Sequence, residues 1–374
     1  HQLGMNTFAV VTGGGTSGHV LPALAVADAL VASGHDASTI RYVGAWRGIE
    51  TRLLPDTPYP HDFLDVVGFQ RRVTPANLGF VPKMFAATRR ATALLRNWSP
   101  QVVVSVGGYA SMPAVFAAVR LGLPVVVVSY DRTPGRASRL AARRAAACAV
   151  AFENSPLPRA EVTGAPIRQV ILDVERDAEH RRTARAALGV PDDRFLVAVM
   201  GGSLGSGVLN EAIAGYLVDH RQDADLAVRQ VAGERFASSV EVVGSGSGDV
   251  LHQVVAYESD MAAVYAGCDV LVGRGGASTV HEVAVTGTPA ILVPWAASAD
   301  DHQTDNVRWL SEVGGAELLT EDRLGDLGRL LDELRAAPER LRGIGEAARR
   351  RGQVSRSGAL AELVEWVAVT SSAS

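Results

Sequence analysis

The strongest constraint on the fold of this chain is a local pattern that occurs twice: a short apolar run, a glycine-rich loop and an alanine-rich helical stretch. The first copy runs from TFAVVT through GGGTSG to LPALAVADALVASG, and the second is RFLVAVMGGSLGSGVLNEAIAGYL at residues 194–217. Further apolar runs such as QVVVSVGG, PVVVVSY and PAILVPW alternate with helical patterns, which is typical of parallel sheets covered by helices. We therefore predict an α/β protein with two doubly wound, Rossmann-like domains.

The length of 374 residues also favours two domains, because it exceeds what one hydrophobic core usually serves. The run PLPRAEVTGAPIRQV supplies the proline and glycine expected of a junction. We predict an N-terminal domain over residues 5–163 and a C-terminal domain over residues 164–344. The last helical stretch, about residues 345–370, is expected to complete the first domain.

The composition describes an ordinary globular protein and excludes several classes. Hydrophobic residues make up 47% of the chain and charged residues 20%, and no apolar run is long enough to span a membrane. Lys83 is the only lysine, which excludes an ATP-binding P-loop and disfavours Schiff-base chemistry. Cys148 and Cys268 are isolated in apolar surroundings and suit core packing in a reduced compartment. We expect a cytoplasmic protein without a nucleic-acid partner and without a secretory signal, residues 1–4 being a remnant ahead of Met5.

The first glycine loop contains Gly13, Gly15 and Gly18 in the G-x-G-x-x-G spacing of dinucleotide-binding proteins. That interpretation also requires an acidic residue at the end of the second strand, but STIRYVGAW has none and Glu50 lies well past it. A nicotinamide or flavin enzyme is therefore disfavoured. The second loop, GGSLGSG, has a better composition for a diphosphate, because Ser203 adds a hydroxyl donor to a row of backbone amides. Both loops could instead serve only as tight turns.

His19 directly follows the first loop and is expected in the first turn of the next helix, at the edge of the sheet where α/β folds bind ligands. We interpret it as a general base, with a core histidine as the alternative.

Several segments resemble, in order and spacing, the MurG family of glycosyltransferases. They are GGGTSGHVLPALAVADAL, VVVSVGGYASMPA, VTGAPIR, VMGGSLGSGVLNEAI and GRGGASTVHEVAVTGTPAILVPW followed by ADDHQTDNVRWL. The resemblance covers about Val10 to Leu310. It implies a glycosyltransferase-B fold, two domains facing a cleft, and transfer of N-acetylglucosamine from UDP-N-acetylglucosamine to a lipid-linked muramyl pentapeptide in peptidoglycan synthesis.

The resemblance implies roles for individual donor-side residues. Glu282 would accept hydrogen bonds from the ribose hydroxyls, Gln303 would contact the donor sugar, and Arg168 would neutralise the diphosphate. The remaining implied donor-site residues are Gly202, Ser203, Gly205, Ala277 and Ser278. No metal or other cofactor is expected, because amides, a helix dipole and an arginine would replace the cation. The pair Asp223 and Asp225, spaced like a metal-binding D-x-D, is interpreted as solvated surface.

On the acceptor side, His19 would remove the proton from the acceptor hydroxyl as it attacks the anomeric carbon opposite UDP, which inverts the configuration. The implied acceptor-side residues are Thr16, Ser17, Gly18, Gly107, Gly108, Tyr109, Tyr130 and Asp131. The chain departs from the family here, since Val128, Ser129, Tyr130 and Asp131 replace a histidine-glutamate-glutamine-asparagine string. Leu204 replaces a glutamine in the second loop, and Ser17 replaces a glycine in the first.

These departures keep other functions open. A related glycosyltransferase could act on a glycolipid, a capsular intermediate or a natural product. A sugar-nucleotide epimerase and a UDP-sugar-binding protein without turnover are further alternatives.

The segment from Phe69 to Trp98 contains six basic residues and no acidic one, interleaved with apolar side chains. This composition suits adsorption to anionic lipid without insertion. We predict a peripheral site on the inner face of the cytoplasmic membrane; its residues are Phe80, Lys83, Met84, Phe85, Arg89 and Arg90. A helix that packs by its apolar residues and exposes an ordinary charged face would explain the same sequence.

Overall fold

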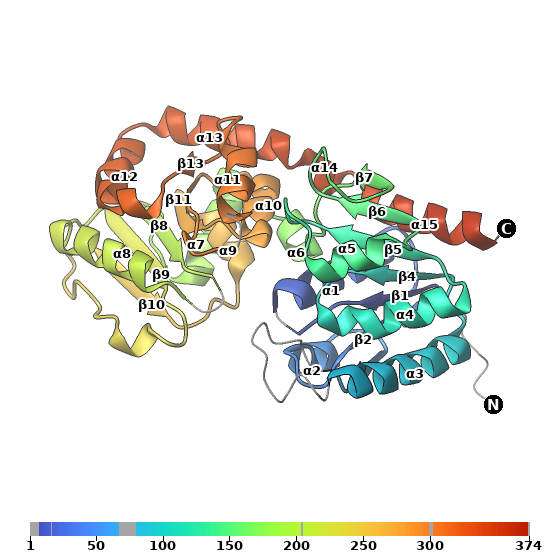
Figure 1. Ribbon diagram of the computed structural model, residues 1–374. Helices are drawn as coiled ribbons and strands as arrows, with labels where there is room; N and C mark the ends of the chain where they lie inside the picture. The colour runs from blue at the N-terminus through green and yellow to red at the C-terminus, as the bar shows by residue number, and fades with distance from the viewer. Residues whose placement is uncertain (1–6, 16, 67–79, 203–204, 299–301, 373–374) are drawn as a thin grey trace. The chain divides into compact units, whose positions relative to one another are not determined.

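The computed structural model describes residues 7–15, 17–66, 80–202, 205–298 and 302–372 (Figure 1). The chain forms two compact units. Unit 1 comprises residues 1–169 and 354–374, and unit 2 comprises residues 170–353.

Unit 1 contains one sheet of seven parallel strands in the order β3-β2-β1-β4-β5-β6-β7. The order changes direction between β1 and β4, and such switch points are where doubly wound folds bind ligands. The strands are β1 (Ala9–Thr12), β2 (Ile40–Ala45), β3 (His61–Leu64), β4 (Val102–Ser105), β5 (Val125–Ser129), β6 (Ala147–Val150) and β7 (Ala160–Val162).

The central strands of unit 1 are buried on both faces. Val102, Val103 and Val104 of β4 are consecutive and fully buried. Because successive side chains of a strand point to opposite faces, helices must cover both sides of this sheet. The continuous valine runs of the sequence follow from this double burial.

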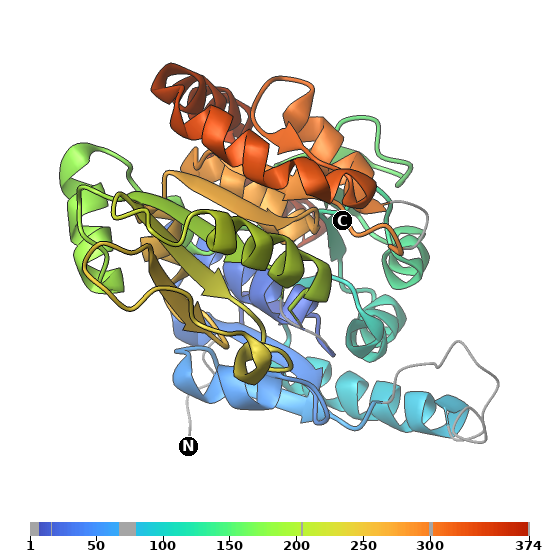
Figure 2. The same cartoon turned by 90° about the vertical axis from the view of Figure 1, so that its left-hand side faces the viewer.

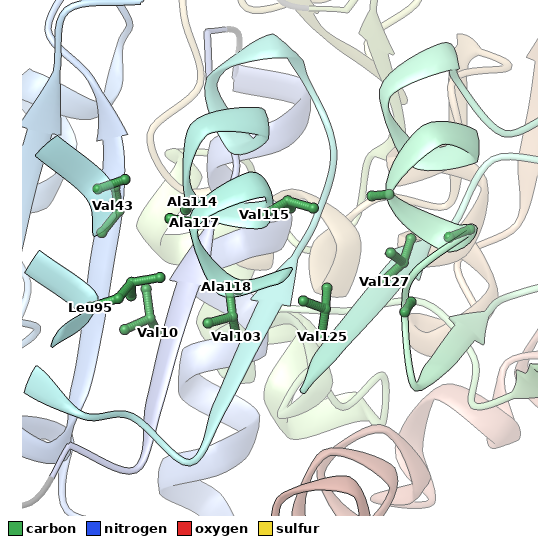
Figure 3. Close-up of a cluster of buried hydrophobic side chains, with 14 of the residues drawn as sticks. Val10, Val43, Leu95, Val103, Ala114, Val115, Ala117, Ala118, Val125 and Val127 are labelled. Carbon is green, nitrogen blue, oxygen red and sulfur yellow. The ribbon is translucent and has the colours of Figure 1, made fainter. Parts of the chain in front are cut away.

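The helices α3 and α4 lie side by side (Figure 1) and close the core that Figure 3 shows. Leu95 of α3 and Ala118 of α4 join a buried cluster with Val10, Val103 and Val125 of the sheet. The C-terminal helix α15 packs against α1, β4 and β6. The helices of this unit are α1 (Ser17–Ala32), α2 (Glu50–Leu53), α3 (Phe80–Trp98), α4 (Met112–Leu121), α5 (Arg136–Ala142) and α15 (Ala359–Ser372), and the chain passes between the units at α6 (Gln169–Leu172) and α14 (Gln353–Arg356).

Unit 2 contains six parallel strands in the order β10-β9-β8-β11-β12-β13, with the same kind of switch point between β8 and β11. The strands are β8 (Phe195–Met200), β9 (Leu226–Val231), β10 (Leu251–Val255), β11 (Val270–Arg274), β12 (Ala290–Val293) and β13 (Glu317–Leu318).

Leucines and isoleucines from three helices fill the core of unit 2. Ile213 of α8, Leu331 of α12 and Ile344 of α13 pack against Val197 and Val272 of the sheet. The helices of unit 2 are α7 (Ala178–Leu188), α8 (Gly207–Asp219), α9 (Met261–Gly267), α10 (Ala277–Thr286), α11 (His302–Ser311), and, orange to red in Figure 2, α12 (Leu327–Arg335) and α13 (Pro338–Arg351).

An aspartate fastens the amino end of the unit 2 sheet. Asp269, just before β11, accepts hydrogen bonds from Arg181 at 2.5 Å, from Arg185 at 2.6 Å and from the amide N–H of Leu196 at 2.7 Å. Arg185 is almost fully buried, so its guanidinium needs this charge partner. The contact links α7 to β8 and β11.

The prediction of two doubly wound parallel sheets is confirmed, and both cysteines are buried as expected. The D-x-D pair is only half as predicted: Asp225 is exposed, but Asp223 is partly buried and forms an ion pair with Arg335 at 2.5 Å. Within the described ranges, no helix is long and apolar enough to cross a membrane.

Candidate active site

The loop after β1 brings His19 against two glycines that follow β4. His19 lies in the first turn of α1, as predicted, and is partly buried. A Cβ atom added to Gly107 would lie 3.5 Å from Cδ2 of His19, and one added to Gly108 would lie 3.4 Å from its Cγ. The same Cβ on Gly108 would lie 2.5 Å from the carbonyl oxygen of Gly14, so the two loops approach too closely for a side chain there.

Burial lowers the pKa of His19 from its ordinary value of 6.5, because the loss of hydration disfavours the charged imidazolium. The ring is therefore neutral at pH 7. A neutral imidazole at the carboxyl edge of a parallel sheet is suited to accept a proton from a bound hydroxyl.

Glu50 occupies the first glycine loop, although it lies five residues beyond the end of β2. Its side chain is fully buried. Oε1 accepts hydrogen bonds from the amide N–H of Ala45 at 2.8 Å and of Gly15 at 3.3 Å. Its distance from the strand end gave no reason to expect Glu50 at this site, but the chain turns back and places the carboxylate on the loop.

Two tyrosines lie beside this carboxylate. The hydroxyl of Tyr42 donates to the carbonyl oxygen of Gly13, and a Cβ on Gly15 would lie 2.6 Å from Cε1 of Tyr109. Burial, and then the charge of Glu50, raise the pKa of both tyrosines. Both hydroxyls are therefore protonated at neutral pH.

The other acceptor-side candidates follow β5 and the first loop. Tyr130 is buried, and its hydroxyl donates to the carbonyl oxygen of Gly18, while Asp131 is exposed. Burial and the neighbouring Asp131 raise the pKa of Tyr130. Thr16 and the side chain of Ser17 lie outside the described residues. Tyr130 thus connects residues 128–131, which differ from the family's usual sequence, to the start of α1.

The second glycine loop follows β8 in unit 2. Gly202 and Gly205 have φ values of 86° and 77°, which favour glycine, and Ser206 caps α8 by accepting from the amide of Leu209 at 3.4 Å. Ser203 and Leu204 lie outside the described residues. The amino end of α8 therefore lies where a diphosphate loop of this fold presents its amides.

Arg274 holds this loop and was not singled out in the sequence. Its guanidinium donates to Oγ of Ser206 at 2.8 Å and to Oε1 of Glu321 at 2.6 Å. The signal was present in the run VLVGRGG, where an arginine ends a buried strand immediately before two glycines. Its partners lie 68 and 47 positions away, so only the fold reveals them.

The predicted donor-side residues Glu282 and Gln303 both have partners within unit 2. The hydroxyl of the buried Tyr265 donates to Oε2 of Glu282 at 2.7 Å. Oε1 of Gln303 accepts hydrogen bonds from the amides of Gly275 at 3.1 Å and Trp295 at 2.9 Å. The amide nitrogen Nε2 of the same side chain is therefore the atom that can donate a hydrogen bond to a ligand. These bonds orient both side chains.

The remaining donor-side candidates are divided between the units. Ala277 and Ser278 begin α10, directly after Gly275 and Gly276 at the end of β11. Arg168 belongs to unit 1, is exposed, and lies near Tyr59, whose pKa is raised by burial and by Asp28 and only partly offset by the charge of Arg168. The structure thus groups the candidates of unit 2 at one sheet edge and leaves Arg168 in the other unit.

A buried relay of polar side chains supports α8 behind the second loop. The amide of Val243 donates to Nδ1 of His252 at 3.0 Å, so Nε2 carries the proton and donates to Gln230 at 2.9 Å. Gln230 donates to Asn210 at 2.9 Å, and Asn210 donates to the carbonyl oxygen of Ala232 at 3.2 Å. Every direction follows from the first bond, so the relay requires neutral His252.

No cluster of three or more histidine, cysteine, aspartate or glutamate side chains able to hold a metal ion occurs within the described part of the chain.

Comparison with known proteins shows that the chain is a glycosyltransferase. Residues 9–150 match the glycosyltransferase family 28 N-terminal domain, and residues 196–359 match the glycosyltransferase family 28 C-terminal domain. The two halves of one glycosyltransferase family therefore occur in order along the two units, with the glycosyltransferase-B fold that the sequence predicted.

Relatives of nearly the same length narrow the class further. The chain is 32% identical over 371 residues to the UDP-N-acetylglucosamine–N-acetylmuramyl-(pentapeptide) pyrophosphoryl-undecaprenol N-acetylglucosamine transferase of Desulforudis audaxviator, covering 96% of this chain and 98% of the relative. It is 37% identical over 349 residues to the transferase of the same name from a Nocardioides species, covering 91% and 92%. The crystal structure of Acinetobacter baumannii MurG superposes with a TM-score of 0.70 at 26% identity, covering 96% of this chain and 98% of that one. The chain belongs to the MurG family.

We predict that the free energy of unfolding decreases as the pH is lowered from 6.5 toward 4. Burial lowers the pKa of His252 from 6.5 to about 4, so in this window the unfolded chain binds a proton that the folded chain does not. Above pH 6.5 both states are neutral at this residue and its contribution is complete. Urea unfolding at several pH values measures the effect, and His252→Gln, whose amide can both accept and donate, is expected to reduce the loss. A variant that keeps the full wild-type loss would contradict the assignment.

Proposed function

We propose that this protein transfers N-acetylglucosamine from UDP-N-acetylglucosamine to a lipid-linked N-acetylmuramyl pentapeptide. The observation that carries the proposal is the similarity to relatives bearing this activity in their name, which extends over 96% of the chain and through both units. The site chemistry is compatible with it: a neutral histidine in unit 1 and a glycine loop at a helix start in unit 2.

The proposed reaction is a single displacement. His19 takes the proton of the acceptor hydroxyl as the oxygen forms a bond to the anomeric carbon of the donor sugar. The bond from that carbon to the phosphate oxygen breaks, UDP leaves with its electron pair, and the configuration inverts. The proton stays on His19 until the product departs.

The donor is proposed to bind along the carboxyl edge of the unit 2 sheet. Amides at the start of α8 together with Ser203 would face the diphosphate, and Arg168 would add a positive charge. Glu282, held by Tyr265, would accept bonds from the ribose hydroxyls. Nε2 of Gln303 would donate to the sugar, with Ala277 and Ser278 lining the same edge. These groups would stabilise the leaving UDP without a metal ion.

Residues 128–131, which differ from the sequence usual in the family, bear on the identity of the acceptor. Tyr130 is buried and bonded to Gly18, so it stabilises the loop rather than presenting its hydroxyl to a ligand. Asp131 is the exposed member of the string. The second candidate function is therefore transfer to a related acceptor that carries a different chemical group where it meets Asp131.

The proposal is tested by incubating the protein with labelled UDP-N-acetylglucosamine and the lipid-linked muramyl pentapeptide. Transfer is expected, and His19→Ala should lower kcat by about 100-fold or more, the usual contribution of a general base. His35→Ala, near the other end of the same helix, serves as the matched control. The acid limb of kcat/KM should lie below pH 6.5, because burial lowers the pKa of His19.

Binding of UDP without transfer to this acceptor would support the proposed donor site but reject the role in peptidoglycan synthesis. Full activity of His19→Ala would reject the base.

The proposed ribose contact of Glu282 can be tested separately from the base. Replacing it by glutamine should raise KM for UDP-N-acetylglucosamine by about 10- to 100-fold, because charged hydrogen bonds to the ribose would become neutral ones. The kcat value should change far less, since the ribose is remote from the reacting carbon. Tyr265→Phe removes only the hydroxyl that holds the carboxylate and should give a smaller rise. Unchanged KM in Glu282→Gln, measured by initial rates, would contradict the ribose contact.

We also propose that α3 attaches the protein to the inner face of the cytoplasmic membrane. Val81 is 71% exposed and Phe85 is 67% exposed, and Arg89 and Arg90 are exposed on the same helix. Met84 departs from the predicted patch, because it is partly buried and packs on the core of unit 1. Lys83 is partly buried, and the side chain of Phe80 lies outside the described residues.

Sedimentation with phosphatidylglycerol vesicles tests this attachment. Arg89→Ala and Arg90→Ala should each weaken binding by about fivefold, the usual effect of one cation near an anionic surface. Phe85→Ser should weaken it as well, whereas Val218→Ser, at an exposed valine of unit 2, should not. Equal binding to neutral phosphatidylcholine vesicles would contradict the electrostatic part of the proposal.

A further inference from the structure

The first glycine loop of unit 1 already contains an anion, the carboxylate of Glu50. Three glycines surround it so closely that no side chain fits. A Cβ on Gly14 would lie 2.3 Å from Oε1, one on Gly48 would lie 1.8 Å from Oε2, and one on Gly44 would lie 2.9 Å from Cγ. These glycines belong to two loops and a strand that meet only in the fold.

The hydrogen bonds to this carboxylate are of the same kind as those that a phosphate-binding loop offers to its ligand, with one amide from the loop and one from the end of β2. In such loops, successive backbone N–H groups converge on the oxygen atoms of a phosphate. Here the amides of Gly15 and Ala45 converge on Glu50, with Gly15 at 3.3 Å and 3.4 Å from the two oxygens and Ala45 at 2.8 Å from one. The first loop is therefore occupied by the protein itself.

The same carboxylate joins the loop after β1 to the loop after β2. α1 begins immediately beyond the first loop, so the position of Gly14 and Gly15 sets where the turn carrying His19 starts. A Cβ on Gly108 would lie 2.5 Å from the carbonyl oxygen of Gly14 and 3.4 Å from Cγ of His19, so the backbone of Gly108 lies close to both the loop and the imidazole. We therefore expect a displacement of the loop to move His19 through the backbone.

We infer that Glu50 is a positioning residue: its carboxylate fills the anion position of the first glycine loop, closes that loop to phosphate, and holds His19 in place for proton removal. The kinetic part of this inference rests on the proposed glycosyl transfer. The anion position itself can be tested without any activity.

The kinetic test compares two substitutions at this position. Glu50→Ala removes the carboxylate and leaves a space of its size, and kcat should fall by about 100-fold, as expected when a catalytic group is displaced by about 1 Å. Glu50→Gln fills the space with a neutral amide and should lose less. KM for UDP-N-acetylglucosamine should stay within about twofold in both, because all the proposed donor contacts except Arg168 are in unit 2.

Sodium formate distinguishes positioning from a general loss of structure. Formate is a free carboxylate that can occupy the space in Glu50→Ala, and it should restore kcat at least tenfold. Formamide, which has the same shape without the charge, should not. Glu50→Gln should not respond to formate, because its side chain fills the space.

The matched control is Asp269→Asn in unit 2. Asp269 is also a carboxylate that accepts a backbone amide, at 2.7 Å from Leu196, but it lies at the amino end of the sheet. This variant should lose thermal stability, and formate should not raise its kcat.

A thermal unfolding scan tests the anion position independently of transfer. Formate at about ten times its dissociation constant should raise the Tm of Glu50→Ala by about 3 °C relative to chloride at equal ionic strength, and should leave wild type and Glu50→Gln unchanged. If wild type shows no transfer, the proposed function fails while this scan still decides the anion position.

Wild-type kcat in Glu50→Ala would overturn the inference. A loss of kcat that formate does not reverse, with no formate-dependent rise in Tm, would overturn it equally.

Discussion

The pairing of β1 between β2 and β4 is the constraint on which the proposed acceptor half depends. Thr12, the last residue of β1, is in register with Val43 on one side and Ser105 on the other, and its hydroxyl donates to the carbonyl oxygen of Val43 at 2.9 Å. The loop after β1 is consequently held between the loops that follow its two neighbours. One neighbour supplies the carboxylate of Glu50, and the other supplies the glycine backbone beside His19. Neither contact would exist in a different strand order.

The glycine loop of unit 2 is also held in place by side chains, but by different chemical groups. It is held from the side by the guanidinium of Arg274 on Ser206. Behind α8, the relay from Val243 to Asn210 passes through a histidine that must stay neutral. The loop of unit 1 is thus held by a carboxylate that fills it, and the loop of unit 2 by a guanidinium at its side that is paired with Glu321. This difference agrees with the proposed division of labour, in which only the second loop would face the diphosphate.

Much of this architecture could be predicted from the sequence because its signals are local. The three consecutive valines of β4, Val102–Val104, are all apolar and buried, as a strand covered on both faces requires. The positions of His19 and the two glycine loops follow from the same strand-to-helix pattern. The contacts of Glu50, Arg274 and Tyr130 could not be predicted, because each joins residues 35 to 112 positions apart. Glu50 also lies beyond the end of β2, whereas dinucleotide-binding proteins have their acidic residue at the strand end.

The single lysine of the chain has a practical consequence for α3. Since Lys83 lies on this helix and every other basic side chain of the chain is arginine or histidine, a reagent that acylates primary amines modifies no other side chain. The reaction also removes one cation from the helix without changing its apolar residues. Acylation of Lys83 with and without vesicles, followed by mass spectrometry, therefore reports on the surroundings of α3 through one labelled side chain.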